Sequence, residues 1–150
     1  MENANRILLQ CQEVLPLSML ENNNLRSKID QMVYILRSMS DDAIYNMKES
    51  NDKKTNTLLN LYANLSHFMQ HFKPWLIGSL SLRMVEITMN TGLGSKASIA
   101  FAYFGGVLIS IGYVSEGRRL GEICSGSLLF QLHTVSNNIS QWAFESFAWP

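Results

Sequence analysis

The chain has few cysteines and few charged side chains, and each scarcity excludes a class of protein. Two cysteines in 150 residues cannot build a disulfide-rich secreted scaffold. Charged residues make up 16% and hydrophobic residues 47% of the chain, which excludes an ordinary disordered tail. A formal net charge of +0 disfavours a globally basic nucleic-acid binder. The sequence therefore predicts one domain, residues 1–150, that is long enough to bury a core.

Familiar catalytic motifs are also missing from the sequence. It contains no G-x-x-x-x-G-K-[ST] phosphate loop and no G-x-S-x-G nucleophile motif, and no two carboxylates can be paired for acid–base chemistry. Cys11 and Cys124 occupy apolar-face positions that are typical of small core residues. We therefore expect no enzyme, with no catalytic residue, no cofactor-binding residue and no metal ligand.

Two short patterns resemble ligand sites, and each has a simpler structural interpretation. Residues 92–97 match G-x-G-x-x-A, but a dinucleotide site needs a preceding strand, and the residues before this run have a helical pattern. His67 and His71 stand four residues apart on one predicted helix, a spacing used by metal sites, yet no third ligand lies nearby in the sequence. We expect a helix stop followed by a helix start in the first case, and two partly exposed helix residues in the second.

Apolar residues recur with the period of an α-helix along most of the chain, and none of it alternates clearly enough to indicate a sheet. Three sets show spacings of three and four: Leu25, Ile29, Met32, Leu36 and Met39; Leu58, Tyr62, Leu65, Met69 and Phe72; and Ile77, Leu80, Met84 and Ile87. A shorter set, Ile7, Cys11 and Val14, stops near Pro16. The fold class predicted is all-α.

Turn and cap residues divide this pattern into about seven helices. Ser40 and Ser95 are expected to cap helices, Ser115 to open one, and Gly92 and Gly112 to end one each. The expected helices span residues 4–14, 24–39, 41–47, 54–72, 75–90, 97–111 and 115–130, with a shorter one at 138–148.

Charge is concentrated in the first third of the chain. Residues 1–54 hold 15 of the 24 charged side chains, and the longer remainder holds nine. The first part is expected to form exposed helices and loops, and the second to form helices buried on more than one face. Arg118 and Arg119 form the only adjacent basic pair in the second half. Because no aromatic residues alternate with cations there, we interpret them as a solvated face or as ion-pair partners.

The uncharged run at residues 97–115 has two possible interpretations. It is close to the length of about 20 residues that a membrane span requires, so the alternative to a packed helix is a small single-span membrane protein anchored through this run. However, Gly112 and Ser115 shorten the expected helix, and Lys and Arg counts mark no cytoplasmic side. With no secretory signal pattern at its start, the chain is expected to be cytoplasmic.

Small residues in the second half resemble those of a tetratricopeptide unit, which is a pair of helices joined by a tight turn. The matching positions are Phe101, Phe104, Gly105, Leu108, Gly112, Gly117, Gly121 and Cys124. The resemblance places Gly105 in the first helix and Gly117 and Cys124 in the second, where small side chains let two backbones approach closely. It implies antiparallel helical hairpins stacked as an array.

A longer match covers residues 7–132, with its best part at 55–132. The runs at 82–92, 98–105 and 117–121, together with an upstream run at 36–54, resemble the helical-repeat region of large signalling proteins. These proteins join a serine/threonine kinase, an AAA-type ATPase and a sensor histidine kinase. The kinase loop, the H-R-D motif, the phosphate loop and the phosphoacceptor His motif of that family are all missing here. The resemblance therefore implies a non-catalytic helical scaffold or protein-interaction segment.

The expected partners of such a segment are proteins, either adjacent repeats or a signalling partner. We expect no nucleic acid, and a membrane only in the alternative above. Repeat arrays need polar caps at their ends, whereas residues 144–150 are rich in aromatics. The chain is therefore interpreted as a fragment of a longer array, or a product derived from one, with a tendency to self-associate.

Overall fold

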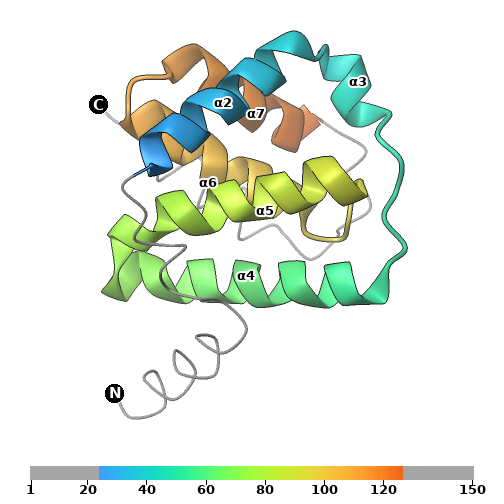
Figure 1. The fold of residues 1–150 in the computed structure, drawn as a ribbon, viewed down its shortest axis with the longest axis horizontal. Helices are drawn as coiled ribbons and strands as arrows, with labels where there is room; N and C mark the ends of the chain where they lie inside the picture. The colour runs from blue at the N-terminus through green and yellow to red at the C-terminus, as the bar shows by residue number, and fades with distance from the viewer. Residues whose placement is uncertain (1–23, 127–150) are drawn as a thin grey trace.

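Six α-helices and one short 3-10 helix account for most of residues 24–126, the part of the chain that the computed structural model describes (Figure 1). The elements are α2 (Leu25–Ser38), α3 (Asp41–Tyr45), α4 (Lys53–Phe72), η2 (Pro74–Leu76), α5 (Ile77–Thr91), α6 (Ala97–Ser110) and α7 (Val114–Gly126). Within these residues the β-structure is limited to one isolated parallel bridge, between Glu49 and Leu93. The all-α prediction is confirmed. The helices expected at 4–14 and 138–148, with Cys11, lie outside the described residues.

Local signals explain where several of these helices begin and end. Ser40 caps α3, since its hydroxyl accepts a hydrogen bond from the Ala43 amide at 3.1 Å. The Asp52 carboxylate caps α4 by accepting from the amides of Lys54 and Thr55. Gly92 ends α5 with a φ of 100°, a conformation that other residues rarely adopt.

Two predicted helix starts differ from the structure. The N-cap of α6 is Lys96, which makes no side-chain capping bond, so Ser95 does not cap this helix. α7 already begins at Val114, so Ser115 lies within its first turn. The Ser115 hydroxyl donates instead to the Glu116 carboxylate at 2.9 Å. A cap residue stabilises a helix start only where the chain places it at the N-cap position, and helix ends shift by one or two residues around such signals.

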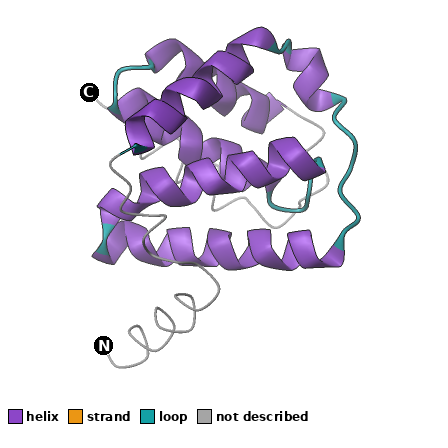
Figure 2. Ribbon diagram, viewed as in Figure 1, coloured by secondary structure: helices purple, strands orange, loops and turns teal. Residues whose placement is uncertain are grey.

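Consecutive helices pack on one another from α4 to α7. α4 and α5 are joined through η2 and lie side by side, and α6 contacts α5 as well as α7 (Figure 1). α2 lies across this stack and contacts α5. The connections are mostly short loops, and the loop between α3 and α4 carries the chain from the α2 side to α4 (Figure 2).

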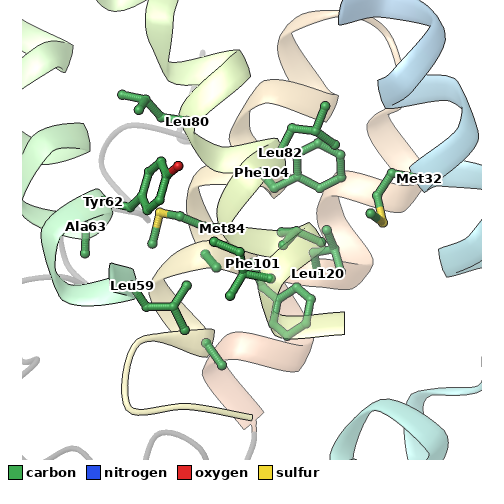
Figure 3. Packing of buried hydrophobic residues seen from close by; sticks show 14 of the residues in the cluster. Met32, Leu59, Tyr62, Ala63, Leu80, Leu82, Met84, Phe101, Phe104 and Leu120 are labelled. Carbon is green, nitrogen blue, oxygen red and sulfur yellow. The ribbon is translucent and has the colours of Figure 1, made fainter. Parts of the chain in front are cut away.

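A single core receives side chains from all six described α-helices and from η2. Figure 3 shows Tyr62 of α4 beside Met84 of α5, with Phe101 and Phe104 of α6 and Leu120 of α7 close by. Leu80, Met84, Phe101 and Phe104 have no solvent-exposed surface. The predicted apolar sets therefore face the core, with one exception. Phe72, in the last turn of α4, is 56% exposed and stacks on Phe68 of the same helix.

The uncharged run at 97–115 is divided between α6, a turn and the first residues of α7. α6 is 14 residues long and is buried on several sides, as expected for a helix with packed neighbours on two sides. Among the residues that the structure describes, no helix has the length and apolar character required to cross a membrane.

Candidate protein-contact surface

α6 and α7 approach each other closely at two glycines. A Cβ atom at Gly117 would lie 2.5 Å from the Gly105 carbonyl oxygen and 2.5 Å from Cγ1 of Ile109. A Cβ atom at Gly105 would in turn lie 3.0 Å from the Gly117 carbonyl oxygen. Each glycine therefore leaves space for the other's backbone, which confirms the predicted placement of both at a helix crossing.

Ion pairs join the charged first third of the chain to the few charges of α7. Arg37 of α2 donates through Nε to Oε1 of Glu116 at 2.6 Å, and its terminal amino group also contacts this oxygen. The Glu116 side chain is only 11% exposed. The Arg37 side chain is 58% exposed, so the charge that this pair shields from solvent is the α7 carboxylate and not a charge of α2. This arrangement could not be predicted from the charge distribution.

Arg119 links α2, α3 and α7 at one point. Its guanidinium donates to the carbonyl oxygens of Leu36 and Met39 at 2.7 and 2.5 Å, and to the Asp41 carboxylate at 2.6 Å. Carbonyls at the end of a helix have no partner within that helix, so a cation there both satisfies them and complements the helix dipole. The basic pair noted in the sequence is therefore split: Arg119 has a structural role, whereas Arg118 is exposed.

Replacing Arg119 with methionine is expected to lower the free energy of unfolding by about 2–3 kcal/mol, because hydrogen bonds to a charged group contribute about 1.5–3 kcal/mol. The methionine keeps the apolar stem but leaves the Leu36 and Met39 carbonyls without this donor. Arg118→Met is the matched control and should change stability by less than about 0.5 kcal/mol. Urea denaturation followed by circular dichroism measures both. Equal effects of the two substitutions would contradict the assigned role of Arg119.

Tyr113, in the turn between α6 and α7, lies between two arginines of α2. The guanidinium carbons of Arg26 and Arg37 are 5.2 and 5.7 Å from its ring centroid, within the range of cation–π attraction. Its hydroxyl donates to Asp30 at 2.7 Å, and Arg26 also donates to the Ile111 carbonyl at 3.3 Å. This turn is thereby fixed against one face of α2.

The ion pair between Arg37 of α2 and Glu116 of α7 should weaken at low pH. Burial acts to raise the pKa of this carboxyl, but hydrogen bonds from Arg37, the backbone and Ser115 outweigh burial and leave the pKa below its ordinary value. Because its pKa is lowered in the folded state, Glu116 stabilises the fold at pH values above its ordinary pKa near 4.5. This contribution is lost as the pH falls through the pKa of the folded state. We expect the loss of melting temperature between pH 6 and about pH 3 to be smaller in Glu116→Gln than in the wild type. Parallel pH profiles in the two proteins would contradict this.

An open apolar groove lies where α2, α5 and α6 meet. Its volume is about 430 Å³, and it is lined among others by Leu25, Ile29, Trp75, Ile77, Val107 and Ser110. None of the described residues that line it is charged. Trp75 is 69% exposed at its edge. We call this feature the α2–α5–α6 groove. No pattern in the sequence indicates this groove, since its residues come from three separate segments.

The structure places the glycine pattern at 92–97 in a loop that follows a helix. Gly92 ends α5, and the Leu93 amide donates to the Lys48 carbonyl at 2.9 Å. A Cβ atom at Gly94 would lie 2.5 Å from the Asn56 side-chain oxygen. These glycines make room for neighbouring chain segments, and the element directly before them is helix α5, whereas a dinucleotide site would require a strand there.

His67 and His71 lie on the exposed side of α4, as expected. Their ring centroids are 6.0 Å apart, and Nε2 of Gln70 lies 3.3 Å from Nδ1 of His67 and 3.2 Å from Nε2 of His71. Within residues 24–126, no group of three or more His, Cys, Asp or Glu is arranged to hold a metal ion. Cys124 is partly buried and its thiol donates to the Ser98 carbonyl at 3.2 Å. Burial raises the pKa of this thiol to about 12, so it is a poor nucleophile at neutral pH.

The described fold therefore has three contact features: the close approach of α6 and α7 at two glycines, the ion pairs and hydrogen bonds that join α2 to α7 and its preceding turn, and the apolar α2–α5–α6 groove. Comparison of the whole chain with family models, with curated proteins and with solved structures finds no match.

Proposed function

We propose that this chain is a non-catalytic helical scaffold that works by contact with other proteins, like the helical-repeat spacer of the signalling kinases that its sequence resembles. The observation that carries the proposal is the serial packing of α4 on α5, α5 on α6 and α6 on α7, with a glycine crossing in the last pair. Helices that pack on consecutive neighbours are the building principle of repeat arrays.

Exposed apolar side chains support a contact role. Tyr34 and Ile35, adjacent on α2, are 76% and 43% exposed, while the opposite side of α2 buries Ile29, Val33 and Leu36. In a repeat array, such an outer face is covered by the next helix. We propose that a helix of an adjacent repeat covers this face of α2. In the purified chain, where no adjacent repeat is present, a second copy of the chain can take its place.

The proposal predicts self-association that depends on concentration. Multi-angle light scattering of the purified chain should show a mass above 17.0 kDa that rises with concentration. The double variant Tyr34→Ser, Ile35→Ser should shift this equilibrium toward monomer. Ser38→Ala, an exposed position on the same helix, serves as the control. A clean monomer at high concentration would count against the proposal.

The alternative is a small membrane protein anchored through residues 97–115. A cosedimentation assay with lipid vesicles, carried out without detergent, separates it from the scaffold. The scaffold predicts that the protein stays in the supernatant at every lipid concentration, whereas an anchored protein pellets with the vesicles.

A further inference from the structure

We infer that the α2–α5–α6 groove is filled by a segment of this same chain, residues 15–20, which precede α2. The groove is apolar and open, and its edge carries the 69% exposed indole of Trp75. Exposed apolar surface of this kind in a monomer marks a contact site. The inference goes beyond the proposed scaffold role, because this contact is made within one chain and does not depend on a partner.

Proximity is the first argument for this occupant. Leu25, the first residue of α2, itself lines the groove. The chain therefore enters the described structure at the groove, with 23 residues before Asn24. Leu17 is eight residues from Leu25, and an extended chain of that length spans roughly 26–29 Å. A short tether of this kind gives an effective concentration in the millimolar range, which a separate partner would have to match.

Chemistry is the second argument. The segment reads LPLSML and carries four large apolar side chains, Leu15, Leu17, Met19 and Leu20, without a charge. The described residues that line the groove are likewise uncharged. Pro16 favours an extended conformation for the residue before it, so the segment suits an extended path along the groove.

The floor of the groove is suited to close contact with another piece of chain. Gly78 of α5 and Gly106 of α6 both line it, and a Cβ atom at Gly78 would meet Leu25 and Val107 at 3.5 and 3.9 Å. Both glycines expose backbone along the groove, and the side chains of Leu25 and Val107 lie beside Gly78. The chain beyond α7 is a weaker candidate, since Ile111 lines the groove three residues before α7 begins and a helix of 13 residues then carries the chain about 20 Å along its axis.

Disulfide trapping in the full chain tests the inference. The background protein carries Cys11→Ser and keeps Cys124, because its thiol is buried and donates to the Ser98 carbonyl. Leu17→Cys is combined with Ser110→Cys in the groove, or with Ser125→Cys in the last turn of α7 as the control. Mild oxidation should link positions 17 and 110 within one chain at least roughly tenfold faster than positions 17 and 125. Equal rates would overturn the inference, and links between chains at position 110 would assign the groove to a second copy instead.

Tryptophan fluorescence provides a second test that needs no disulfide. Trp142→Phe and Trp149→Phe leave Trp75 as the only tryptophan. In this background, Leu17→Asp with Leu20→Asp should release the segment, shift the Trp75 emission to longer wavelength and increase its quenching by acrylamide. Asn22→Asp with Asn23→Asp adds the same charge without removing an apolar side chain, and should leave the spectrum unchanged. An unchanged spectrum in the leucine variant would overturn the inference. Light scattering of the same variants keeps this result separate from the scaffold proposal.

Discussion

Replacing Gly117 with alanine is expected to lower the free energy of unfolding by about 2–3 kcal/mol, the cost of overpacking a tightly packed core. The new methyl group would lie 2.5 Å from the Gly105 carbonyl oxygen, and a backbone atom cannot rotate away as a side chain can. α6 and α7 would have to separate, which would also disturb the contacts of Leu108 and Leu120 in the core. Urea denaturation monitored by circular dichroism measures the change.

Gly121 provides a matched control one turn further along α7. A Cβ atom there meets nothing within 4 Å, so Gly121→Ala gains only the better helix propensity of alanine. This substitution should raise the free energy of unfolding by up to about 1 kcal/mol. The same change four residues apart should therefore have opposite signs. If both variants were stabilised, α6 and α7 could not be in close contact at Gly117.

Replacing Gly92 with alanine is expected to cost about 3 kcal/mol or more, from backbone strain together with a steric clash. Its φ of 100° lies in a region that residues with a Cβ atom avoid. A Cβ atom there would also overlap the Lys48 carbonyl oxygen, which accepts from the Leu93 amide. The substitution should therefore break the contact between the loop before α4 and the loop before α6. Thermal unfolding and hydrogen exchange at Leu93 measure the global and local effects.

Gly112 separates the two contributions at Gly92. It has nearly the same φ, 102°, but a Cβ atom there has no neighbour within 4 Å. Gly112→Ala should therefore lower the free energy of unfolding only by the backbone strain, about 1–2 kcal/mol. If Gly112→Ala proved as destabilising as Gly92→Ala, the close approach of the Lys48 carbonyl would contribute nothing.

Much of the helical fold could be predicted from local sequence. The sets that contain Ile29, Tyr62 and Met84 predicted which faces are buried, because a period of 3.6 residues fixes neighbours on a helix whatever packs against it. Gly92 and Gly112 marked helix ends, since their conformation depends on the backbone alone. The prediction was weaker at Ser95 and Ser115, where a capping residue was present but the loop geometry selected another start.

Local patterns were enough to predict that the chain is helical, which apolar residues form the core and where small residues allow two helices to cross. The pairing of Arg37 with Glu116 and the contact of Arg119 with the end of α2 emerged only from the packing of the helices. These partners are about 80 residues apart in the chain, and no local rule connects them. The α2–α5–α6 groove has the same origin. Periodicity reports which side of one helix is apolar, whereas a groove depends on how three helices are placed relative to one another.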